Sequence, residues 1–209
     1  MIKDRNQIFT TGATKVAFVI PTLFNRPYLV QQCVESIVAN MENFRVEYSI
    51  TIVVNEASQE FDDHDFNFPV IKKNSHLAFN IAKALNTGAA DQHQFDFFCY
   101  VDEGVTFKDK NWLDKAIQVF AENPSIGLIG CRSHSTFKKY RKLFSTNPLI
   151  YEVLWADGLL LTPMRNYQIV GGFDETFFAD CELQDFGYKL HKAGFRNLFW
   201  DGLISHVLI

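Results

Sequence analysis

The stretch Asp157–Gly202, DGLLLTPMRNYQIVGGFDETFFADCELQDFGYKLHKAGFRNLFWDG, decides the fold of this chain. It begins with an apolar run and passes through a glycine-containing turn at Gly171–Glu175. An acidic cluster at Asp180–Asp185 then leads into a helical stretch that Ala-Gly closes. A strand is predicted over Phe199–Ile204, which begins with two aromatic residues, and His206 follows it.

Upstream of this stretch, apolar segments of two kinds alternate. Short β-branched or aromatic runs predict strands, and stripes at helical spacing predict helices. The expected strands are Val16–Ile20, Ser49–Asn55, Phe97–Val101 and Ile126–Gly130, and the expected helices follow Pro27, span Leu77–Ala90 and contain Leu113–Phe120. This order predicts an α/β fold, a Rossmann-like mostly parallel sheet flanked by helices on both faces, in a single domain over residues 1–209.

Composition narrows the possible functions. The chain has 209 residues, 47% of them hydrophobic, and a formal net charge of -4, so we do not expect it to bind nucleic acid. The four cysteines form no metal-binding or disulfide pattern and favour a reducing compartment. The first residues carry no secretory signal, and no apolar run reaches the about 20 residues of a transmembrane segment. We expect a cytoplasmic protein, or one peripheral at a membrane.

Polar residues follow three of the expected strands. In open parallel sheets, ligands bind beyond the carboxyl ends of the strands, so Thr22–Arg26, Asn55–Ser58 and Asp102–Gly104 are expected to line one crevice. The first set offers a strand end, a helix N-terminus and a guanidinium group to an anionic ligand. Each set has a simpler interpretation as a turn between a strand and a helix.

Several of these motifs, as they stand, resemble family 2 glycosyltransferases with the GT-A fold. They are PTLFNRPYL at Pro21–Leu29, VVNEAS at Val53–Ser58, NTG at Asn86–Gly88, YVDEGV at Tyr100–Val105, WADG at Trp155–Gly158 and GGFDE at Gly171–Glu175. The resemblance implies a nucleotide-binding half over about residues 15–105 and an acceptor half over about 106–209. It also implies a nucleotide-sugar donor, and a glycan or glycoconjugate as the acceptor.

The resemblance assigns roles to individual residues. The nucleotide-binding set is Pro21, Thr22, Asn25, Arg26, Asn55, Glu56, Asn86 and Asp102, and the acceptor-binding set is Trp155, Asp157 and Gly158. Asp102, Glu103 and His206 are implied to bind Mn²⁺ or Mg²⁺, since carboxylate oxygen suits these hard cations and imidazole suits Mn²⁺. Gly104 stands where the family has a direct metal ligand.

The general base is the least settled assignment. Leu183 takes the position of the family's base but belongs to the apolar stripe of the expected helix. The candidates are therefore Glu182, predicted to lie on the exposed face of that helix, and Asp180, with Asp185 as a further catalytic candidate. Alternatively, Asp180 caps the helix, Glu182 interacts with its dipole and Asp185 pairs with Lys189.

Three functions remain open on the sequence. The first is an inverting, metal-dependent glycosyltransferase of the hexosyltransferase class, with a UDP-sugar favoured as donor. The second is a catalytically impaired, glycosyltransferase-like module that binds a nucleotide or a sugar, which Gly104 and Leu183 favour. The third is a nucleotidyltransferase. It predicts a Gly-rich phosphate loop after the first strand, and PTLFNRPYL is not such a loop.

Overall fold

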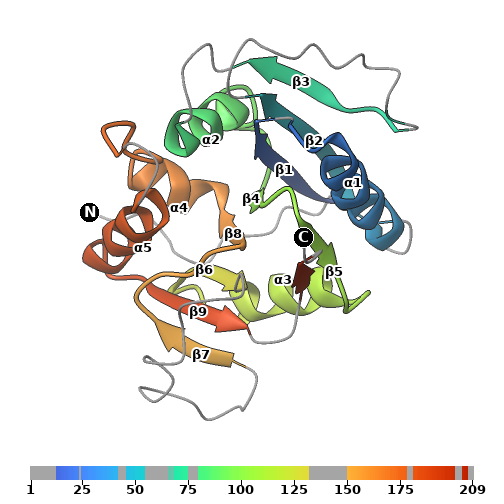
Figure 1. Ribbon diagram of the computed structural model, residues 1–209. Coiled ribbons are helices and arrows are strands. Elements are labelled where there is room, and N and C mark those ends of the chain that lie inside the picture. Colours follow the sequence, from blue (N-terminus) through green and yellow to red (C-terminus); the bar gives the residue numbers. More distant parts are fainter. Residues whose placement is uncertain are drawn as a thin grey trace.

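The computed structural model describes residues 13–23, 25–41, 46–54, 66, 68–74, 80–131, 150–177, 181–200 and 204–206. Its larger sheet has eight strands in the order β3-β2-β1-β4-β8-β6-β9-β7 (Figure 1). Their bounds are β1 Thr14–Thr22, β2 Val46–Val54, β3 Ile71–Asn74, β4 Phe97–Val101, β6 Ile126–Cys131, β7 Ile150–Val153, β8 Leu159–Pro163 and β9 Arg196–Trp200. The short strands β5 (Val105–Phe107) and β10 (Ile204–His206) pair with each other in a separate sheet.

Most neighbouring strands run parallel, as expected from the sequence. Strands β3, β2, β1 and β4 form a continuous parallel block, and β9 is parallel to β6. Strand β8 is antiparallel to both β4 and β6, and the edge strand β7 is antiparallel to β9. The chain is thus a mixed α/β domain whose carboxyl strand ends from β1, β2 and β4 share one edge.

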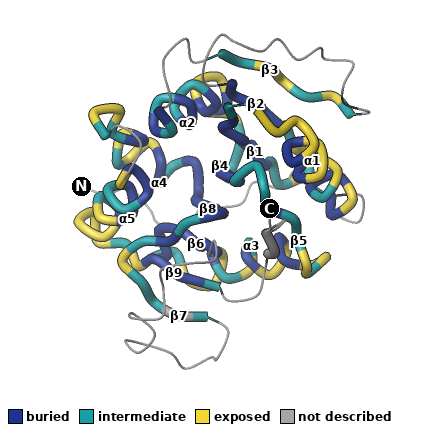
Figure 2. Tube along the Cα trace, in the orientation of Figure 1, coloured by how far each residue is buried: buried dark blue, intermediate teal, exposed yellow. Residues whose placement is uncertain are grey.

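Helices cover both faces of the sheet. Their bounds are α1 Pro27–Met41, α2 Ile81–Ala89, α3 Trp112–Glu122, α4 Met164–Ile169 and α5 Glu182–Lys192. Because side chains alternate along a strand, Phe18 packs with α1 and α3 on one face while Val19 packs with α2, α4 and α5 on the other. The central strands β1, β4, β8 and β6 are largely buried (Figure 2). Among the described helices, none is long and apolar enough to cross a bilayer.

Two boundaries differ from the sequence-based expectation. The strand predicted over Phe199–Ile204 is wrong: β9 ends at Trp200, and Ile204 begins β10. The two segments pair with different sheets, which an aromatic run does not reveal. Helix α2 begins at Ile81, later than expected, because the Asn80 side chain accepts a hydrogen bond from the Lys83 amide and caps the helix there.

Gly88 lets α2 lie directly on β1. A Cβ at this position would lie 2.3 Å from Cγ1 of Val19, which is fully buried. We therefore expect Gly88→Ala to lower the free energy of unfolding by ~1–3 kcal/mol, although alanine is the better helix former. Denaturant titration checks this against Thr87→Ala, whose half-buried side chain is on the same helix. A Gly88→Ala protein as stable as wild type would contradict the packing.

Candidate active site

A cavity of about 290 Å³ opens at the carboxyl edge of β1 and β4. Its lining residues are Pro21, Thr22, Leu23, Asn25, Arg26, Ile81, Tyr100, Asp102 and Glu103. Two of the three strand-end sets predicted from the sequence therefore meet in one cavity. Asn55 and Glu56 lie outside the described residues, but β2 ends at Val54, directly beside Thr22 of β1.

The acid pair follows β4 in a tight turn. The Val105 amide donates a hydrogen bond of 3.0 Å to the carbonyl of Asp102. Both acidic side chains line the cavity, and the Thr22 hydroxyl donates to the carboxylate of Glu103. Gly104 lies in this turn and is not among the glycines with positive φ, so a left-handed backbone is not the reason for a glycine at this position.

The charges of this pair are held in a poorly solvated place. Burial raises the pKa of Asp102, the backbone amide of Glu103 lowers it, and the charge of Asp157 raises it further. Burial also raises the pKa of Glu103, against which the Thr22 hydrogen bond and the more distant Arg26 act. A cation beside these carboxylates would offset the cost of keeping them ionised.

This burial predicts a stability gain on removing a charge. Because the pKa of Asp102 is raised in the folded protein, its protonated form stabilises the fold. This contribution to the free energy of unfolding is fully present below the ordinary pKa of about 3.9 and is lost as pH rises through the raised value. We expect Asp102→Asn to unfold with ~0.5–2 kcal/mol more free energy at pH 7, a gain that shrinks as pH falls toward about 4. Urea titrations at several pH values measure it. The exposed Asp114 provides the control, and an equal gain in Asp114→Asn would contradict the explanation.

The expected acceptor residues lie beside the acid pair. The Asp102 amide donates a hydrogen bond of 3.0 Å to the carbonyl of Gly158, whose backbone is left-handed with φ 74°. Asp157 is half-buried, and its charge acts on Asp102. Trp155 is also half-buried, and its Cβ would lie 2.8 Å from a Cβ added at Gly187 of α5. This segment therefore connects the acid pair to α5.

Glu182 is the first residue of α5, and the expectation that it lies on an exposed face is wrong. Its side chain is only 6% exposed, and Leu183 beside it packs in the core at 8%. The charge of Glu182 acts on the buried hydroxyl of Tyr100, together with those of Asp102, Asp157 and Glu103, and all raise the Tyr100 pKa after the larger effect of burial. Tyr100 also lines the cavity, together with both residues of the acid pair.

The start of α5 also revises the expected cap. The N-cap position is Cys181, which has φ 72° and makes no side-chain capping bond, and Asp180 lies outside the described residues. Asp185 forms an ion pair of 3.0 Å with Lys189, as the alternative interpretation of the helix predicted. Of the catalytic candidates that the structure describes, Glu182 is the one whose charge acts on Tyr100.

The chain is similar to known proteins in sequence and in structure. No family model matches it. It is 22% identical to the O-antigen biosynthesis protein RfbC of Myxococcus xanthus over an alignment 228 positions long, which covers 88% of the chain but only 16% of that protein. The catalytic domain of Drosophila β1,4-galactosyltransferase 7, in complex with xylobiose, superposes with a TM-score of 0.63 at 16% identity, over 94% of this chain and 72% of that one.

Two further solved structures are similar. A mannosyltransferase from Pyrobaculum calidifontis, in complex with GDP-Man and Mn²⁺, gives a TM-score of 0.63 at 16% identity over 92% of this chain and 58% of that one. GalNAc-T7, with UDP, GalNAc and Mn²⁺, gives 0.72 at 13% identity over 95% and 44%. The chain has the GT-A fold. The fold expected from the sequence motifs is thus confirmed.

The residues at the cavity are compatible with the divalent cation that several proteins of GT-A fold hold in their structures. Mg²⁺ is commonly bound by one or two carboxylates and by phosphate oxygens of the substrate. Asp102 and Glu103 provide the two carboxylates of such a site. Within the described ranges, no group of three or more His, Cys, Asp or Glu side chains could hold a metal. His206 pairs through its backbone with Val105, just after the acid pair, and its side chain is not described.

The structure adds an observation on each of two residues, Asn86 and Tyr100. Asn86 does not line the cavity, and its side chain bonds to Phe173, Glu175 and Tyr167 instead. A nucleotide contact would require it to give up one of these bonds. We expected no role for Tyr100 beyond the buried strand and the YVDEGV motif, yet it lines the cavity. Its position could have indicated this, because residues two apart on a strand share a face and Tyr100 lies two positions before Asp102.

Proposed function

We propose that the chain is an inverting glycosyltransferase of GT-A fold, which moves a sugar from a nucleotide diphosphate sugar to a hydroxyl group of a glycan or glycoconjugate. The observation that carries this proposal is the cavity in which Asp102 and Glu103 meet Thr22 and Arg26. Carboxylates for a cation and a guanidinium for phosphate oxygens are the groups that a nucleotide diphosphate requires. The glycosyltransferases of the same fold support it.

The donor end of the site is assigned to the first half of the chain. Every lining residue that the structure describes belongs to residues 15–105, the half in which the nucleotide is expected to bind. Asp102 and Glu103 would hold Mn²⁺ or Mg²⁺, and the cation would neutralise charge that develops on the departing diphosphate. Arg26, exposed at the start of α1, is suited to the phosphate oxygens. We favour a UDP-sugar, which one of the similar structures supports and another, with GDP-Man, does not.

The acceptor end is assigned to the second half. Glu182 accepts the proton of the acceptor hydroxyl as that oxygen attacks the anomeric carbon. The new bond joins the acceptor oxygen to the anomeric carbon, and the bond from this carbon to the diphosphate oxygen breaks, with inversion. Asp157 and Trp155 provide hydrogen-bonding and stacking groups for the acceptor sugar, on the side of Asp102 where Gly158 is hydrogen-bonded.

A module that only binds a nucleotide or a sugar is the second candidate. The specific observation in its favour is that Leu183, at the position of the family's base, is buried among the core residues of α5. A binding module needs the cavity but not Glu182. Measured transfer separates the two candidates, because both predict nucleotide binding.

The test is a donor screen followed by a transfer assay. Thermal shift is measured for UDP, GDP and their sugar conjugates, with Mn²⁺ and with a chelator, and hydrolysis or transfer is then measured for the donors that bind. We expect stabilisation by one nucleotide diphosphate class that depends on the cation, and slow donor hydrolysis. Binding with no turnover of any donor would favour the binding module. No binding of any nucleotide would overturn the proposal.

A further inference from the structure

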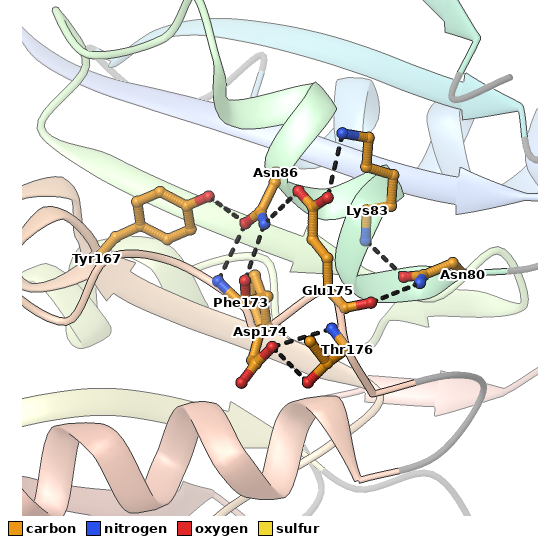
Figure 3. Close-up of polar contacts among 8 residues, drawn as sticks. All are labelled: Asn80, Lys83, Asn86, Tyr167, Phe173, Asp174, Glu175 and Thr176. Carbon is orange, nitrogen blue, oxygen red and sulfur yellow. Dashed lines mark hydrogen bonds and ion pairs between the residues drawn. The ribbon is translucent and has the colours of Figure 1, made fainter. Parts of the chain in front are cut away.

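The side chain of Asn86 joins the two halves of the chain. Its amide nitrogen donates to the carbonyl of Phe173 and to Oε1 of Glu175, both at 2.9 Å. Its amide oxygen accepts from the Tyr167 hydroxyl at 2.7 Å and from the Phe173 amide at 3.0 Å (Figure 3). These bonds use both donors and both acceptors of the group. Asn86 therefore joins α2 to the turn Gly171–Glu175 as a bridge, with all its side-chain hydrogen-bonding groups satisfied.

Two neighbours on α2 strengthen the bridge. Lys83 forms an ion pair of 3.1 Å with Glu175. Asn80, which caps α2, also donates to the backbone carbonyl of Glu175 at 3.0 Å. Three residues of one helix thus bind the same short turn, which Figure 3 shows beneath the helix. Directional bonds of this kind fix the position of the turn along α2 as well as its distance from it.

The same turn is attached to α5. The Phe173 ring stacks on Phe186 with 4.4 Å between centroids and 24° between planes, and Lys189 donates to the carbonyl of Gly172 at 3.3 Å. Phe186 lies four residues after Glu182, one helical turn further along. The placement of the turn therefore sets the placement of Glu182. The N-terminus of α2 reaches the cavity, because Ile81, which follows the capping residue Asn80, lines it.

We infer that Asn86 is a positioning residue, which holds α5 so that Glu182 stays in register with the donor cavity. The inference rests on the proposed function for its catalytic part only. Asn86 contacts neither the nucleotide nor the acceptor in this scheme. It acts through the turn and through Phe186, and its removal shifts Glu182 while the cavity residues keep their own supports in β1 and β4.

The first experiment compares Asn86→Ala with Asn166→Ala. Asn166 is also a buried asparagine, but it bonds to the carbonyls of Ile126 and Gly127, at the amino end of β6 and away from the cavity. We expect Asn86→Ala to lower kcat by about 10-fold to 100-fold with little change in the donor KM or in UDP affinity, since small misplacements of catalytic groups have effects of that order. Asn166→Ala should lose stability and keep its kcat. Loss of UDP affinity in Asn86→Ala would overturn the inference in favour of a nucleotide contact.

Two further variants separate positioning from general weakening. In the Glu182→Gln background, Asn86→Ala should have no additional effect on kcat, whereas additive losses would contradict action through Glu182. The exchanged pair N86D/E175Q restores a hydrogen bond in the reverse direction, while N86D alone sets two carboxylates together. We expect the pair to recover at least about half of the kcat that N86D loses on a logarithmic scale, because restoring a contact is what a double-mutant cycle detects. No recovery would count against the bridge.

Hydrogen exchange tests the bridge without any assay of transfer. In Asn86→Ala, the amides of the turn and of the first turns of α5, such as that of Asp185, should exchange faster, and in Asn166→Ala they should not. Unchanged protection in Asn86→Ala would overturn the inference whatever the enzyme does. If the wild-type protein transfers no sugar, the proposed function fails, and this measurement alone decides whether Asn86 positions α5.

Discussion

Glu182→Gln is expected to lower the rate of sugar transfer by ~10²–10⁴-fold while the affinity for the donor stays near that of wild type. Glutamine has almost the same shape but cannot accept the proton of the acceptor hydroxyl. We expect Glu182 to act as the base because it is buried at the start of α5 and its charge acts on Tyr100, which lines the cavity. Steady-state rates and equilibrium binding of the donor measure the two parts of the prediction.

A matched substitution guards against a general effect of losing a carboxylate. Glu152→Gln changes the same atoms on β7, where Glu152 pairs with Arg196 at 2.8 Å on the far edge of the sheet. It should keep its activity. Full activity in Glu182→Gln together with a collapse in Asp180→Asn would move the base to Asp180. Full activity in both would exclude a base at this end of α5.

Asp102→Asn is expected to abolish the tightening of nucleotide diphosphate binding by Mn²⁺ or Mg²⁺, and most of the transfer activity with it. An amide oxygen is a weaker ligand than a carboxylate for a hard cation and brings no charge. The same variant is expected to be the more stable protein, so loss of function would not reflect unfolding. Calorimetry with UDP, in metal and in chelator, measures the effect.

The matching substitution at Glu103 serves as the comparison for Asp102→Asn. Glu103→Gln should retain part of the metal effect, because Asp102 remains and the Thr22 hydroxyl can still donate to the amide oxygen at position 103. Equal UDP affinity with metal and with chelator in the wild-type protein would remove the cation from the site. Full metal enhancement in Asp102→Asn would place the cation elsewhere.

Local patterns predicted the strands that carry the donor side of the site, but not the contacts between segments far apart in the sequence. Strand β4 was predicted at Phe97–Val101 because five apolar side chains in a row require burial on both faces, and the acids after it therefore lie at a strand end. The burial of Glu182 was missed because helical periodicity shows which residues share a face but not what covers the first turn. The bonds of Asn86 join residues 87 positions apart, as with Phe173, and no local pattern encodes them.

The cysteines of this chain provide an experimental handle on the site. Cys33, Cys99 and Cys131 are buried, whereas Cys181 is exposed and directly precedes Glu182. Thiol-reactive reagents modify accessible cysteines far faster than buried ones. A maleimide fluorophore would therefore attach to the native protein at this one position, beside the start of α5, with no engineered label site. Its emission would report in real time on donor and acceptor arriving at the site.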